Sequence, residues 1–138
     1  MADPRAFISF DFDHDEEQRT LFAGQGKKAS PTPFTIGDWS SKEDLAQSQW
    51  EAIIKDKIAR CHMVIVLVGR FMASAGGVTK ELAMAKELSV PVFGVYVDGA
   101  TSSSTLPTSL PRSRTIAWTW PGVAAMIDHC MTEGKNKK

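Results

Sequence analysis

Two uninterrupted apolar runs with a helical pattern between them constrain the fold of this chain more than any other feature. The runs are Val64–Val68 and Val90–Val97, and neither has the polar alternation of a strand that is exposed on one face. Strands of a parallel sheet that are covered on both faces have this character. Between the runs, apolar residues recur at spacings of three and four, which predicts a helix over Thr79–Leu88. Strand, helix and strand in this order predict a right-handed βαβ unit.

The other segments extend this unit into an alternating chain. Further strands are predicted at Arg5–Phe10, Pro33–Ile36 and Arg114–Trp118, and further helices at about His14–Ala23, Lys42–Arg60 and Gly122–Met131. Five strands that alternate with helices indicate an α/β fold with one parallel sheet and helices on both faces. We expect the flavodoxin-like strand order 2-1-3-4-5. Residues 1–132 are assigned to this single domain and residues 133–138 to a flexible tail.

Composition and charge exclude several classes of protein. The chain has 16 basic and 16 acidic residues, so a broad basic surface for nucleic acid is not expected. Two cysteines are too few for a disulfide framework or a zinc site, and the three histidines have no metal-ligand spacing, so no metal is expected. The N-terminus lacks the pattern of a signal peptide, and no apolar run reaches the roughly 18 to 20 residues of a membrane span. We therefore expect a cytoplasmic protein that does not contact a membrane.

The fold class predicts where a ligand would bind. In open parallel sheets, ligands bind beyond the carboxyl ends of the strands, here between the first and third strands. The residues expected there are Ser9, Phe10, Asp11 and Asp13 after the first strand, Asp38 and Trp39 after the second, and Gly69, Arg70 and Phe71 after the third. Glu81 is expected in the first turn of the next helix, close to the same point. An acidic residue near a helix N-terminus also stabilises the helix dipole, so Glu81 has a structural explanation as well as a catalytic one.

Two known classes with this fold fit the residues poorly. A phosphoacceptor receiver domain needs an aspartate at the end of its third strand and a lysine after its fifth. This chain has Leu67, Val68, Gly69 and Arg70 at the first place and WTWPG at the second. A flavodoxin needs a Ser-, Thr- and Gly-rich phosphate loop after its first strand. The acidic sequence DFDHDEE at that place would repel a phosphate.

A third class is supported by a resemblance to a known family. The sequence RAFISFDFDHD resembles the opening strand of TIR-like domains, in which a Ser between aromatic and aliphatic residues is followed by acidic residues. The sequence VIVLVGRFMASAGGVTKELAMAKELSVPVFGVYVDG resembles the TIR stretch from the third strand through the Glu-bearing helix to the fourth strand. With DWSSKEDL, these pieces are most similar to the branch that includes the Thoeris anti-phage protein ThsB. The resemblance covers about Arg5–Asp98, some two thirds of the chain.

Membership of that family would imply cleavage of the nicotinamide–ribose bond of NAD+, with release of a cyclic ADP-ribose-type signal. The family's catalytic glutamate falls on Glu81, whose carboxylate would stabilise the oxocarbenium-like ribose cation. NAD+ is the substrate, and no cofactor is implied. Self-association is expected, as is a downstream effector that the product reaches. The cleft would be built from Ser9, Phe10, Asp11, Asp38, Trp39, Arg70 and Phe71, with the aromatic rings excluding water and Arg70 meeting a phosphate.

One position departs from the family pattern. The family usually has a Trp four residues before the catalytic Glu, and this chain has Gly77 there. Either Trp39 or another ring substitutes for it, or the site is altered or inactive. The alternative function is therefore a non-catalytic TIR-type module for protein interaction or nucleotide binding, which acts by self-association. The Ser- and Thr-rich loop Gly99–Ser113 is a candidate surface for that role.

Overall fold

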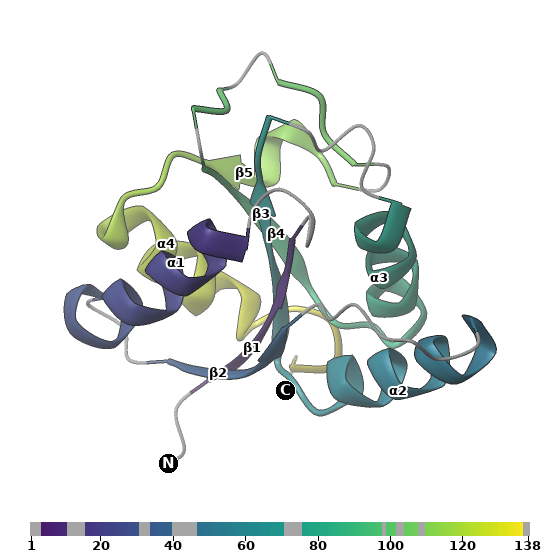
Figure 1. The fold of residues 1–138 in the computed structure, drawn as a ribbon. Coiled ribbons are helices and arrows are strands. Elements are labelled where there is room, and N and C mark those ends of the chain that lie inside the picture. The colour runs from purple at the N-terminus through teal and green to yellow at the C-terminus, as the bar shows by residue number, and fades with distance from the viewer. Residues whose placement is uncertain are drawn as a thin grey trace.

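The sheet and its two layers of helices are visible in the computed structural model of the chain (Figure 1). It describes residues 4–10, 16–30, 34–39, 47–70, 76–97, 99–101, 104–107 and 110–136. The strands are β1 Arg5–Ser9, β2 Thr35–Trp39, β3 Met63–Val68, β4 Val92–Tyr96 and β5 Thr115–Ile116. They form one sheet in the order β2-β1-β3-β4-β5, in which every pair is parallel. The predicted fold class and strand order are confirmed.

Within the residues that the structure describes, four α-helices cover the two faces of this sheet. They are α1 Glu16–Ala29, α2 Gln47–Ala59, α3 Gly76–Glu87 and α4 Trp120–Cys130. In Figure 1, α1 and α4 lie on one side of the sheet, and α2 and α3 lie on the other. The short 3-10 helices η2 Arg112–Arg114 and η3 Gly134–Asn136 flank β5 and α4 along the chain.

The central strand β3 shows why its sequence has no polar alternation. All six of its residues are buried. Because successive side chains of a strand point to opposite faces, Val64, Val66 and Val68 join the core with α2 and α3. Met63, Ile65 and Leu67 join the core with α1 and α4. A strand that is covered on both faces therefore needs apolar residues at every position.

The second strand differs from its prediction. Residues 37–39, which the prediction places after the second strand, continue β2, so Asp38 and Trp39 lie in the strand opposite Phe7 and Ile8 of β1. The register shifts by one residue between Ala6 and Phe7, which leaves Gly37 without a partner in the ladder. A glycine inside a strand is typical of such a bulge. The second strand is thus longer than predicted and has an irregularity at this glycine.

The helices also begin and end at other residues than predicted. The first helix runs to Ala29 and not to Ala23, and the third begins at Gly76 and not at Thr79. Glu81 consequently lies in the second turn of α3 and not, as predicted, in the first. The early part of the predicted helix from Lys42 lies outside the described residues, which resume in α2 at Gln47. In α4, the Thr119 hydroxyl accepts a hydrogen bond from the Gly122 amide and caps the helix, which begins at Trp120, two residues earlier than predicted.

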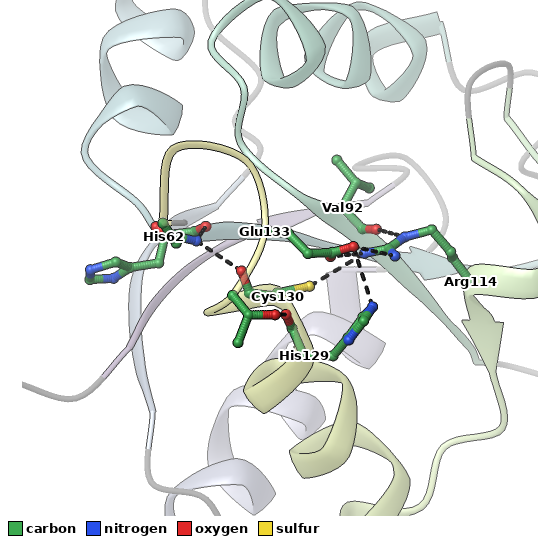
Figure 2. Close-up of polar contacts among 8 residues, drawn as sticks. His62, Val92, Arg114, His129, Cys130 and Glu133 are labelled. Carbon is green, nitrogen blue, oxygen red and sulfur yellow. Dashed lines mark hydrogen bonds and ion pairs between the residues drawn. The ribbon is translucent and has the colours of Figure 1, made fainter. Parts of the chain in front are cut away.

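The segment expected to be a flexible tail is bonded to the domain as far as it is described. The Lys135 amide donates to the Ser89 carbonyl at 2.8 Å, and the Asn136 side chain donates to the His62 carbonyl at 2.7 Å. Glu133 pairs with Arg114 at 2.7 Å. Figure 2 shows Glu133 and Arg114 meeting beside Val92 of β4. Residues 133–136 thus make defined contacts with the domain, where a flexible tail is expected from the sequence.

Candidate functional site

A buried hydrogen bond joins Ser9 to Glu81, which are 72 residues apart in the chain. The Ser9 hydroxyl donates to Oε1 of Glu81 at 2.8 Å. Ser9 is the last residue of β1, so the pair lies toward the carboxyl ends of the strands. The two side chains are 0% and 1% exposed, respectively. The pair therefore forms a polar contact inside the protein core at the edge where ligands bind in this class of sheet.

Local periodicity explains how these two side chains meet. Phe7 belongs to the core shared with α2 and α3, and Ser9, two residues later in the strand, points to the same face. On α3, Val78, Leu82 and Ala85 form the stripe that faces this core. Glu81 lies three residues after Val78, so it occupies a position of that inward stripe. The carboxylate is thus built into a face that is otherwise apolar.

The energetics of this position favour a special role for Glu81. Within the described part of the chain, the buried polar or charged residues are Ser9, Glu81 and Thr115. An ionised carboxylate in an apolar interior is strongly destabilising unless hydrogen bonds or charges compensate for its lost hydration. Proteins retain such groups most often where they serve a function. A helix-dipole role does not account for Glu81, because it lies beyond the first turn of α3.

The remaining predicted site residues fall into three groups. Phe10 is 2% exposed and packs in the core shared with α1 and α4, so its ring lies on the opposite face of the sheet from Glu81. Arg70 is exposed on the turn that follows β3, with its aliphatic stem beside Gly99. The backbones of Asp38 and Trp39 lie in β2, while their side chains are outside what the structure describes. Asp11, Asp13 and Phe71 lie outside the described residues.

Gly77 lies in the first turn of α3, four residues before Glu81. The position is exposed, and a Cβ atom built on it would meet no atom within 4 Å. A Cβ atom therefore fits at this position, where the family resemblance leads us to expect a Trp.

Tyr96 is a polar residue near this edge that the sequence did not single out. It ends β4, pairs with Val68 and packs against the core shared with α2 and α3. Its hydroxyl is buried, and no partner for it is found among the described residues. The signal for Tyr96 was present in the sequence, because it is the one polar side chain in the apolar run Val90–Val97.

A separate cavity of about 480 Å³ lies at the opposite edge of the sheet. It is bordered by Ser89–Val92, which precede and begin β4, and by Leu82, Lys86, Pro111, Arg114, Glu133 and Gly134. Neither Ser9 nor Glu81 lines it. The cavity is thus distinct from the carboxyl edge at which the sequence predicts a nucleotide.

Polar side chains beside this cavity form a structural cluster. Arg114 donates to the Val92 carbonyl at 2.7 Å and to both carboxylate oxygens of Glu133, as Figure 2 shows. The hydrogen bonds from Arg114 hold the pKa of Glu133 below its ordinary value. Burial raises the pKa of the neighbouring Cys130 thiol to about 12. Cys130 therefore stays protonated at neutral pH and is not a nucleophile.

Two further features limit the kinds of site in the described part of the chain. Across residues 4–136, apart from the gaps named above, no group of three or more His, Cys, Asp or Glu side chains is arranged to hold a metal ion. In the same ranges, no helix has the length and apolar character needed to cross a membrane.

Comparison with known families identifies the chain. The family model for the TIR-like domain of the Thoeris protein ThsB matches residues 7–102, more than half of the sequence. A comparison with curated proteins found no match. The matched region runs from β1 past the end of β4 and includes Ser9, Gly77 and Glu81. The chain therefore belongs to the ThsB TIR-like domain family and is a TIR-type protein of anti-phage defence.

Proposed function

We propose that this protein cleaves the nicotinamide–ribose bond of NAD+ and releases a cyclic ADP-ribose-type signal. One observation carries the proposal: a buried carboxylate, Glu81, lies at the carboxyl edge of the sheet within the region that matches the family. The TIR-type defence family supplies the substrate class. The product would act on a downstream effector, and the reaction would take place in the cytoplasm.

The chemistry needs one well-placed anion. When the bond between ribose C1′ and the nicotinamide nitrogen breaks, the bonding electrons leave with nicotinamide, which becomes neutral. The ribose becomes an oxocarbenium-like cation, which a carboxylate in a low-dielectric site stabilises more strongly than one in water. Attack on C1′ by water gives ADP-ribose, and attack by a nucleophile of the same molecule gives a cyclic product. Exclusion of water from the site decides between them.

Burial of Glu81 sets a condition on this function. Because its side chain is 1% exposed, a nucleotide can reach the carboxylate only after the surrounding chain has moved. TIR-type enzymes often complete their sites between neighbouring subunits, which gives a reason for such a movement. We therefore expect turnover to rise more steeply than in proportion to protein concentration, because self-association would open and complete the site.

The test is mass spectrometry of the small molecules formed from NAD+ by wild type and Glu81→Gln. Both are incubated at several protein concentrations, with and without a lysate of phage-infected cells. Nicotinamide and an ADP-ribose-type product should form with wild type and fall at least about 100-fold with Glu81→Gln. Glu87→Gln is the matched control, because Glu87 lies on the same helix but is exposed and pairs with Lys55 at 2.7 Å. It should keep wild-type turnover.

The same experiment separates the enzyme from its alternative. Full activity in Glu81→Gln, with an unchanged melting temperature, would refute the role of Glu81. Absence of turnover by wild type in every condition would refute the enzyme. If wild type and Glu81→Gln then assembled equally well, the protein would be a non-catalytic interaction module.

A further inference from the structure

We infer that Ser9 is a positioning residue for Glu81: its hydroxyl orients the carboxylate and favours the ionised form, and it does not bind the nucleotide. This assignment differs from the cleft-lining role that the family resemblance implies for Ser9. The catalytic consequence depends on the proposed function, because it concerns the same carboxylate. The effect on ionisation does not depend on it, because the hydrogen bond exists without substrate.

Ser9 is held rigidly enough to orient another side chain. It ends β1, which is bonded to β2 on one side and to β3 on the other, with Ser9 opposite Val66. A serine side chain has a single rotatable bond before its hydroxyl oxygen, so Oγ has three staggered positions relative to the strand. Supports of this kind, built on a central strand, hold a functional group more accurately than loops do.

The hydrogen-bonding capacity of Ser9 also favours this role. A serine hydroxyl has one proton to donate, and in this structure the proton points to Oε1 of Glu81 at 2.8 Å. The side chain has no exposed surface. A nucleotide would have to break the contact with Glu81 to receive that proton, whereas a hydroxyl that supports Glu81 keeps it.

The electrostatic effect has a definite direction. Burial disfavours the charged form of a carboxyl group, while a hydroxyl that donates to the carboxylate favours it. Val66 and Leu82 belong to the apolar core on this face, and in such low-dielectric surroundings a hydrogen bond to a charged oxygen is strengthened. Stabilisation of the ribose cation requires the ionised form. Ser9 therefore offsets part of the cost of placing Glu81 in the core.

The decisive experiment titrates the Glu81 carboxyl carbon by NMR in protein labelled with 13C-glutamate, with Glu81→Gln providing the assignment. Removal of the hydroxyl in Ser9→Ala should move the titration midpoint to higher pH by about one unit, since hydrogen bonds to charged groups are individually strong. In turnover, the acid limb of the pH profile should move by the same amount, while KM for NAD+ stays within about twofold. Ser9→Thr, which keeps the hydroxyl, should restore the wild-type midpoint.

Thr115→Val is the matched control. Thr115 is also a buried hydroxyl residue, and it donates to the Pro111 carbonyl at 3.2 Å and not to a carboxylate. Its replacement should leave both the Glu81 midpoint and the acid limb unchanged. If Ser9→Ala fails to fold, Ser9→Cys replaces it, because a thiol of similar size is a weak donor and should raise the midpoint.

Each outcome decides the inference. An unmoved Glu81 midpoint in Ser9→Ala overturns it whether or not the protein turns over NAD+. A large rise in KM with an unmoved acid limb also overturns it, because Ser9 would then bind substrate. The third outcome is a shifted Glu81 midpoint in Ser9→Ala together with no turnover of NAD+ by wild type. It supports the effect of Ser9 on Glu81 and refutes only the proposed function.

Discussion

His62 connects the beginning of β1 to the end of the chain. Its amide donates to the Arg5 carbonyl at 2.7 Å, and its ring nitrogen Nδ1 accepts from the Arg5 amide at 2.9 Å. Its carbonyl accepts from Asn136. Partial burial lowers the pKa of His62, and the positive charges of Lys135 and Arg5 lower it further. A protonated His62 would lose the acceptor for the Arg5 amide and gain a charge beside two cations.

The lowered pKa of His62 predicts that the free energy of unfolding depends on pH. Because the folded-state pKa of His62 lies below its ordinary value of 6.5, the folded state favours neutral histidine. Its contribution to stability is therefore present above pH 6.5 and is lost as the pH falls through the lowered folded value. The free energy of unfolding in urea, measured from pH 7.5 to pH 5, should decline over this range in wild type.

The variant His62→Asn tests whether this histidine causes the decline. Asn offers an oxygen acceptor to the Arg5 amide and does not titrate. Its unfolding free energy should stay nearly constant where that of wild type declines. A full decline in His62→Asn would show that other groups are responsible. Glu133 does not interfere, because its pKa is lowered from an ordinary value of 4.5, so its loss of stability occurs at more acidic pH.

The helix α1 continues past two glycines, Gly24 and Gly26, because aromatic side chains pack against it. Phe22 of α1 lies with its ring centre 5.0 Å from that of Trp120 and 6.3 Å from that of Phe34. A Cβ atom on Gly26 would come within 2.9 Å of the Phe34 ring, so glycine is needed there for close approach. A Cβ atom on Gly24, half a turn earlier, would have no atom within 4 Å.

These two glycines give a matched pair of predictions. Gly24→Ala should stabilise the protein by about 0.5–1 kcal/mol, because alanine is favoured over glycine in a helix and has room here. Gly26→Ala should instead lower the unfolding free energy, since the aromatic rings must shift to admit the methyl group. Thermal or urea unfolding of both variants provides the comparison. Equal gains from both would show that the aromatic packing against α1 is looser than the structure indicates.

The sequence predicts those elements that depend on local sequence pattern, and it misses those that depend on contacts with distant parts of the chain. β3 and β4 were predictable because burial on both faces leaves a local mark, a continuous apolar run. The extent of α1 was not predictable, because Gly24 and Gly26 locally favour the end of a helix. The contact between Phe22 and Trp120, which favours a longer helix, comes from a distant part of the chain. The bulge at Gly37 has the same cause, since only pairing with β1 reveals it.

The candidate site divides in the same way. Topology alone predicted that Ser9 and Glu81 would approach the same point, but not their hydrogen bond, which depends on the rotation of α3 over the sheet. The sequence analysis places Phe10 in the same cleft as Ser9, whereas its ring packs on the opposite face of the sheet. Alternation along a strand could have excluded this, because Ser9 and Phe10 are consecutive and their side chains point to opposite faces.

At the scale of the whole molecule, residues 133–136 tie together segments that are far apart in the chain. The Lys135 ammonium donates to the Ala59 carbonyl at the end of α2, while its amide binds the Ser89 carbonyl before β4. Gly134 has a φ angle of +54°, and a Cβ atom there would lie 2.2 Å from the Ser89 carbonyl oxygen. This close approach is open only to glycine. The segment therefore closes the amino edge of the sheet, away from Ser9 and Glu81.

Removal of residues 133–138 should consequently destabilise the whole domain without altering its chemistry. The deletion removes the Glu133 ion pair with Arg114 and the bonds made by Lys135 and Asn136. At about 1 kcal/mol each, these contacts predict a loss of about 2–4 kcal/mol and a melting temperature lower by roughly 5–15 °C. Deletion of residues 137–138 alone is the control and should change little. Gly134→Ala should reproduce most of the loss with the full chain present. Equal stability of the two truncated proteins would show that these contacts do not close the fold.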